Sequence, residues 1–184
     1  MPVKIKRPTN DAANLAKIGI PGLDDILAGG LTPNRLYLID GDPGSGKTTV
    51  ALQFLMQGAD AGETTLYVTL AESAQELVAV AASHGWSLEN INLLEIIPGG
   101  DALSTDEQIT MFHPSEVELG EATEKILAAV EKYKPKRVVI DSLSELRLLS
   151  QHSLRYRRQI LALKRFFMGR ECTVMLLDDR TADA

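Results

Sequence analysis

The sequence has little cysteine, few aromatic residues and no long hydrophobic run. Its single cysteine, Cys172, cannot form a disulfide framework or a zinc site. Because it lies in the apolar run CTVMLL, we interpret it as a small buried side chain. No apolar run approaches the ~20 residues of a membrane-spanning helix, and the opening MPVKIKRPTN lacks the apolar core of a signal peptide. We therefore expect a cytoplasmic protein without a membrane partner.

The sequence also lacks an excess of positive charge. It has 19 Lys and Arg against 25 Asp and Glu, which gives a formal net charge of −6. No global field therefore attracts it to nucleic acid or to anionic lipid, and any such contact would need a local basic patch. Its length of 184 residues fits one domain with a substantial core.

Short apolar runs alternate with helical patterns along the chain. Residues 1–17 are polar and weakly patterned, so we interpret them as an N-terminal arm before a domain at 18–184. Five alternations predict an α/β fold with a mostly parallel central sheet, flanked by helices on both faces. Right-handed crossovers would place the carboxyl ends of all strands on one rim. Strands are expected at 35–40, 64–70, 91–97, 135–141 and 172–179, and helices at 47–62, 71–85, 115–133 and 153–170, with a short one opened by Pro21.

A glycine-rich segment joins the first of these strands to the following helix and fits the pattern G-x-x-x-x-G-K-[ST]. Its glycines allow backbone N–H groups to turn inward around phosphates, and the helix N-terminus adds a positive dipole end. Lys47 is expected to contact the β- and γ-phosphates, and the Thr48 hydroxyl to bind Mg²⁺. The predicted phosphate site comprises Gly41, Asp42, Pro43, Gly44, Ser45, Gly46, Lys47, Thr48 and Thr49.

Two carboxylates at the ends of other predicted strands complete this pattern. Asp141 ends the apolar run RVVID and is expected to hold Mg²⁺ directly or through a water, rather than only to cap a turn. Many P-loop ATPases place a glutamate directly after this aspartate, but here the position is Ser142. We therefore expect Glu72, just beyond TLYVTL, to activate water. The alternative is a first-turn glutamate stabilised by the helix dipole.

Four segments together resemble the KaiC-like branch of the RecA-type ATPases: GIPGLDDILAGGL, GDPGSGKTT, YVTLAES and VVIDSLSELRLL. The resemblance extends from about Ile18 to Asp179. It implies a RecA-like P-loop NTPase fold, ATP with Mg²⁺ as ligand, and a homo-oligomeric ring that is commonly a hexamer. It also implies that Glu72 is the catalytic glutamate. KaiC has two adjacent glutamates there, whereas this chain has Ala71-Glu72.

The chain departs from the family pattern near its C-terminal end. The family domain continues with several more strands beyond the position of Asp179, and that part supplies adenine contacts and basic finger residues. We therefore expect the domain to be incomplete at its C-terminus. The chain should then bind nucleotide better than it hydrolyses it, because an arginine finger contributes a factor of ~10³–10⁵ in rate. Asp178 and Asp179 would repel a γ-phosphate unless they face away or bind metal, so neither is assigned as a phosphate sensor.

The favoured function is Mg²⁺-dependent ATP hydrolysis, with Lys47 and Glu72 as catalytic residues, coupled to ring assembly and signalling with a protein partner. One alternative is a nucleotide-dependent interaction module with little hydrolysis, and another is a DNA-dependent recombination-type ATPase. The basic residues of 147–170 bear on the last, but apolar residues recur there at helical spacing, so we favour an amphipathic helix packed on the sheet. Those basic residues are Arg147, Arg155, Arg157, Arg158, Lys164, Arg165 and Arg170.

Overall fold

The computed structural model describes residues 15–96, 114–150 and 152–180. The predicted arm before residue 15 and most of the polar connection after residue 97 lie outside the described residues. The elements in chain order are α1 (Pro21–Ile26), β1 (Leu36–Gly41), α2 (Lys47–Asp60), β2 (Thr65–Thr69), α3 (Ala74–Ser83), β3 (Asn92–Glu95), α4 (Pro114–Tyr133), β4 (Arg137–Asp141), α5 (Leu143–Ser150), α6 (Ser153–Phe167) and β5 (Thr173–Asp179).

The five strands form one sheet in the order β1-β5-β4-β2-β3, and every pair of neighbours is parallel. This confirms the predicted parallel sheet. The register places Gly41 opposite Asp179 and Thr69 opposite Asp141. The carboxyl ends of β1, β5, β4 and β2 therefore lie side by side, and the loops that follow them share one rim.

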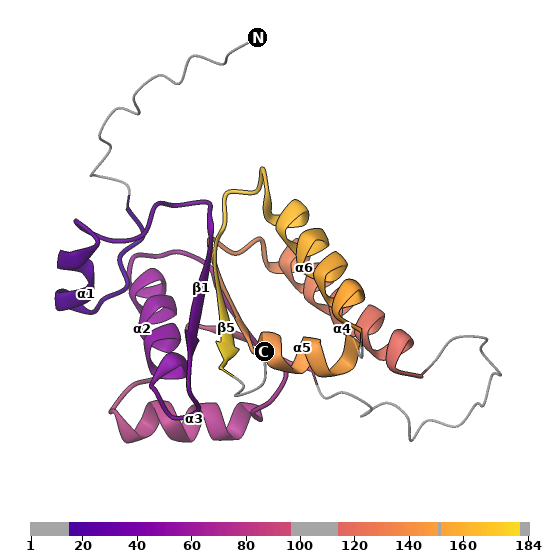
Figure 1. The fold of residues 1–184 in the computed structure, drawn as a ribbon. Helices are drawn as coiled ribbons and strands as arrows, with labels where there is room; N and C mark the ends of the chain where they lie inside the picture. Colours follow the sequence, from indigo (N-terminus) through magenta and orange to yellow (C-terminus); the bar gives the residue numbers. More distant parts are fainter. Residues whose placement is uncertain (1–14, 97–113, 151, 181–184) are drawn as a thin grey trace, which may run out of the picture.

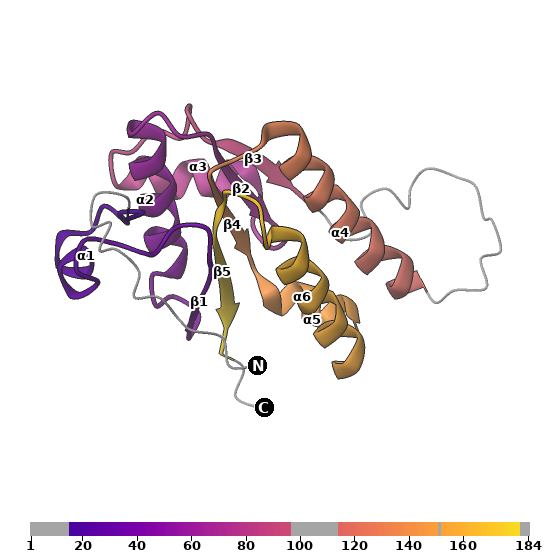
Figure 2. The same cartoon turned by 90° about the horizontal axis from the view of Figure 1, so that it is seen from above.

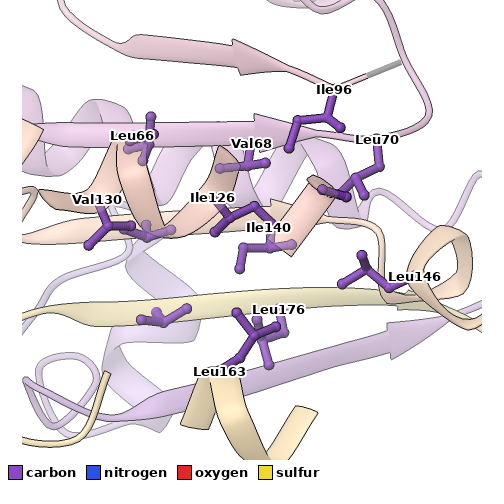
Figure 3. Close-up of a cluster of buried hydrophobic side chains, with 14 of the residues drawn as sticks. Leu66, Val68, Leu70, Ile96, Ile126, Val130, Ile140, Leu146, Leu163 and Leu176 are labelled. Carbon is purple, nitrogen blue, oxygen red and sulfur yellow. The ribbon is translucent and has the colours of Figure 1, made fainter. Parts of the chain in front are cut away.

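Helices cover both faces of the sheet, as Figures 1 and 2 show: α2 and α3 lie on one side and α4, α5 and α6 on the other. Successive residues of a strand point to opposite faces. In β4, Val138 and Ile140 face the α4–α6 side, and Val139 faces the α2 side. The core on the α4–α6 side appears in Figure 3, where Ile126 of α4 and Leu163 of α6 pack near Leu176 and Ile140. The central strands are thus buried on both faces, which explains their continuous apolar sequences.

Strand β1 is less buried than its sequence predicts. The run RLYLID suggests a buried strand, but Leu38 has an exposed fraction of 59%. Within the described part of the chain, β1 pairs only with β5, so it forms an edge of the sheet. Apolar composition indicates a strand but does not reveal its place in the strand order, because that order depends on long-range pairing.

Helix α6 has the amphipathic character predicted from its sequence. Leu163 and Phe167 are buried against the sheet, while Arg157, Arg158 and Arg165 are exposed. Leu163 and Phe167 therefore pack in the core as predicted, whereas Leu154 and Leu161 are exposed. Among the residues described, no helix combines the length and the apolarity needed to cross a membrane.

Candidate nucleotide-binding site

The glycine-rich segment forms a tight loop between β1 and α2. Gly44 and Gly46 have φ of +78° and +90°, in the left-handed region that glycine adopts without a Cβ clash. Gly46 is the N-cap of α2, with no side-chain cap and no acidic residue in the first turn. The first N–H groups of α2, including that of Thr49, are therefore not capped by a side chain. Such a helix end is a suitable site for an anion.

Lys47 extends back over this loop. Its ammonium donates to the carbonyls of Gly41 and Asp42, each at 3.0 Å, and its Nζ lies 2.8 Å from Asp179 Oδ1. The lysine side chain is only 9% exposed. The loop backbone and one carboxylate therefore fix the ammonium in place at the rim.

Asp141 lies next to Thr48, although 93 residues separate them in the sequence. Thr48 Oγ1 donates to Asp141 Oδ2 at 3.2 Å, and the Tyr67 hydroxyl donates to the same oxygen at 2.5 Å. Burial raises the pKa of the Asp141 carboxyl, while the hydrogen bonds from Tyr67 and Thr48 act to lower it. The two predicted Mg²⁺ ligands thus form a contact, and both are hard oxygen donors.

Glu72 lies in a turn between β2 and α3. Its backbone N–H donates to Thr69 Oγ1, and that hydroxyl donates to the Glu72 carbonyl at 2.6 Å. Helix α3 begins only at Ala74, with Ser73 and Glu76 forming a capping box. The glutamate in the first turn of α3 is Glu76, and Glu72 lies just before the N-cap residue Ser73.

The Glu72 carboxylate is a partly buried acid in an acidic neighbourhood. Its Oε2 atom is buried and has no hydrogen-bond partner among the described residues. Burial is the main cause that raises its pKa, followed by the negative charge of Asp141 and smaller effects of Glu76 and Asp179. A buried carboxylate oxygen without a hydrogen-bond partner is unusual in native structures.

The two acids at the end of β5 point to opposite faces of the sheet. Asp178 accepts hydrogen bonds from Ser144 and Arg147 of α5, so it faces away from the phosphate loop. Asp179 faces the loop and pairs with Lys47. Strand alternation predicts that adjacent aspartates diverge, but not which one faces Lys47. The sequence analysis did not find this pairing or the contact of Tyr67 with Asp141.

A parallel α/β sheet with a glycine loop at its carboxyl rim defines a P-loop protein, and the fold is of the RecA type. The family model described as "ATPase: KaiC" matches residues 16–184. The chain belongs to this KaiC ATPase family, as the sequence resemblance indicated. Nucleotide binding is the property that this membership implies.

Individual relatives agree with this placement. The chain is 32% identical over 163 residues to the UPF0273 protein PH0284 of Pyrococcus horikoshii, which covers 85% of this chain and 65% of that protein. It is 35% identical over 130 residues to the circadian clock oscillator protein KaiC of Prochlorococcus marinus, covering 68% of this chain and 25% of KaiC. The crystal structure of the KaiC-like protein PH0186 from Pyrococcus horikoshii matches with a TM-score of 0.72 and 29% identity, over 91% of this chain and 72% of that one.

The matched relatives are longer than the region they share with this chain. The chain spans about two thirds of the Pyrococcus UPF0273 protein and a quarter of the Prochlorococcus KaiC.

Proposed function

We propose that this chain is a Mg²⁺-dependent ATP-binding and ATP-hydrolysing domain that acts in a homo-oligomeric ring with a role in signalling or regulation. One observation carries the proposal. Lys47 and Thr48 of α2, Asp141 of β4 and Glu72 after β2 all lie at the carboxyl rim of the sheet. Glu72 and Asp141 follow or end the neighbouring strands β2 and β4, which lie far apart in the sequence, so the fold brings these residues together.

Nucleotide binding follows from the charges of the loop. The free N–H groups at the start of α2 and the Lys47 ammonium would contact the β- and γ-phosphates. Thr48 Oγ1 and the Asp141 carboxylate, which are in contact, would hold Mg²⁺. The metal, when bound, supplies positive charge that neutralises the β- and γ-phosphate oxygens.

Hydrolysis requires a base for the attacking water. We assign this role to Glu72, whose carboxylate would take the proton as the water oxygen bonds to the γ-phosphorus and the bond to the β-phosphate oxygen breaks. A raised pKa strengthens a carboxylate as a base. The buried Oε2, which has no hydrogen-bond partner among the described residues, would be the acceptor atom.

Steady-state ATPase assays test this function with a matched pair of variants. Glu72→Gln should reduce the rate by a factor of ~10²–10⁴ and retain ATP binding. Glu76→Gln makes the same chemical change four residues further on, where a glutamine still completes a capping box, so it should hydrolyse ATP like the wild type. Equal rates for wild type and Glu72→Gln would reject hydrolysis and leave binding intact.

Ring assembly is tested separately. Multi-angle light scattering in the presence and absence of ATP and Mg²⁺ should show a nucleotide-dependent oligomer. A monomer under both conditions would reject this part of the proposal for the chain while leaving its nucleotide chemistry unaffected.

A second candidate function is a nucleotide-dependent interaction module with little hydrolysis. The contact of Lys47 with Asp179 favours it, because a carboxylate at the catalytic lysine opposes the negative charge of a γ-phosphate. This candidate predicts ATP binding together with a wild-type turnover no higher than that of Glu72→Gln.

A further inference from the structure

Tyr67 is a fully buried tyrosine on a central strand of the sheet. It belongs to β2, which lies between β4 and β3, and its side chain is 0% exposed. Its ring packs in the core on the α2 side with Phe54, Leu55 and Val139. A phenylalanine of nearly the same shape would fill this space. The hydroxyl therefore needs its own explanation.

That hydroxyl lies against two side chains of the candidate site, Asp141 and Thr48. It donates to Asp141 Oδ2 at 2.5 Å, the oxygen that also accepts from Thr48 Oγ1 at 3.2 Å. The register explains the geometry: Asp141 lies opposite Thr69, and Tyr67 is two residues earlier on the same face of β2. Asp141 Oδ1 accepts no hydrogen bond from the residues that the structure describes.

The two donors fix the orientation of a mostly buried carboxylate. With Oδ2 held from the strand side by Tyr67 and from the helix side by Thr48, rotation of the Asp141 carboxylate would break both hydrogen bonds. It would also leave the buried phenol unpaired, which is costly. Oδ1 is thereby kept as the oxygen open to a further ligand.

We propose that Tyr67 is a positioning residue for Mg²⁺ binding: its hydroxyl holds the Asp141 carboxylate in the orientation that receives the metal together with Thr48. This inference rests on the proposed Mg²⁺-nucleotide site. It assigns Tyr67 no contact with nucleotide or metal, since the residue acts through Asp141.

The test compares ATP affinity with Mg²⁺ and with EDTA, by calorimetry, for wild type, Tyr67→Phe and Tyr37→Phe. Tyr37 is a control because its hydroxyl donates to the Thr32 carbonyl, away from the site. Tyr67→Phe should weaken ATP binding about tenfold in Mg²⁺, the scale of a hydrogen bond to a charged group, and less than about twofold in EDTA. Tyr37→Phe should match the wild type in both.

The possible results distinguish a failure of the positioning role from a failure of the proposed function on which it rests. If Mg²⁺ does not strengthen ATP binding by the wild type, the proposed function and the positioning role both fail. If Mg²⁺ strengthens binding equally in wild type and Tyr67→Phe, only the positioning role fails. An equal loss of affinity in Mg²⁺ and EDTA would show a general disruption of the site and would also overturn it.

A spectroscopic measurement that keeps Tyr67 in place covers the case in which Tyr67→Phe does not fold. The chain has four tyrosines, so ¹³Cζ-labelled tyrosine gives four NMR signals. Phenylalanine variants of the other three, Tyr37, Tyr133 and Tyr156, assign the Tyr67 signal by elimination. That signal should shift in Asp141→Asn and on addition of ATP with Mg²⁺, while the Tyr37 signal stays in place. A Tyr67 signal that ignores Asp141→Asn would refute the proposal.

Discussion

The ammonium of Lys47 and the carboxylate of Asp179 form an ion pair with an Nζ–Oδ1 distance of 2.8 Å. Their proximity follows from the pairing of β1 with β5, which places Asp179 opposite Gly41 at the base of the phosphate loop. A phosphate that binds in this loop must share the lysine with Asp179 or displace it.

Asp179→Asn should therefore bind ATP more tightly than the wild type. The substitution keeps the size of the side chain and removes a negative charge beside the expected phosphate position. Asp179 is 36% exposed, so solvent screens part of the effect, and we expect a gain of about three- to tenfold in affinity. Titration calorimetry at fixed Mg²⁺ measures it.

The control for this variant is Asp40→Asn. Asp40 lies on β1 near the same rim and pairs with Arg180 rather than with Lys47. Its ATP affinity should remain within about twofold of wild type, as for other exposed ion pairs. Weaker binding by Asp179→Asn would show instead that Asp179 orients Lys47 for the phosphate.

Glu72→Gln should stabilise the folded protein above acidic pH. The folded-state pKa of Glu72 lies above its ordinary value of 4.5, mainly because of burial. As the pH rises from 4.5 through the folded-state pKa, ionisation of Glu72 lowers the stability of the folded protein. Below pH 4.5 this loss is absent, because the acid is protonated in both the folded and the unfolded state. The gain should be under about 1 kcal/mol after solvent screening.

Thermal unfolding of Glu72→Gln and wild type across pH 4–8, without nucleotide, checks this prediction. The two melting curves should coincide at the acidic end and separate as the pH rises. A constant difference at every pH would show that the effect does not arise from ionisation of Glu72.

Arg137→Ala should destabilise the fold strongly. Its guanidinium is buried beneath α2, pairs with Glu63 at 2.5 Å and donates to the carbonyls of Phe54 and Lys17. Removal leaves these acceptors without their donor, so we expect a loss of about 2–4 kcal/mol in the free energy of unfolding. Urea denaturation measures the loss.

Lys136→Ala provides the comparison for Arg137→Ala. Lys136 is the preceding residue and forms an exposed ion pair with Glu171. Its urea midpoint should stay close to that of the wild type. If both variants lost stability equally, the buried interactions of Arg137 would not be the cause.

The thiol of Cys172 should be unreactive in the native protein. Cys172 is buried, and burial raises the pKa of its thiol to about 12. Because only the thiolate attacks a disulfide reagent, reaction with Ellman's reagent at pH 8 should be at least ~10²-fold slower than in the urea-unfolded chain. As the chain has one cysteine, the signal has one source, and similar rates in both states would contradict its burial.

Local pattern was sufficient for much of the fold. The alternation of apolar runs and helical periods predicted a parallel sheet covered on both faces, and the structure confirms it. The sequence pattern does not reveal helix α5, because only Ser142 separates its first residue, Leu143, from the end of β4 and no loop composition marks the boundary. The start of α3 was placed three residues too early, because Ser73, and not Ala71, caps the helix.

The phosphate loop and the carboxyl ends of β4 and β5 follow from local sequence. The spacing of Gly41, Gly46 and Lys47 identifies the loop, because the loop is a local structure built from consecutive residues. Asp141 was recognisable for the same reason, as the polar residue that ends an apolar strand.

Which distant side chains meet at that loop depends on long-range strand pairing. The pairing of β1 with β5 brings Asp179 to Lys47, and the pairing of β2 with β4 brings Tyr67 to Asp141. Strand order and register arise from the combined packing of two cores and not from any short segment. The ion pairs and hydrogen bonds across the rim therefore could not be predicted from the sequence, although the sequence contains every residue that forms them.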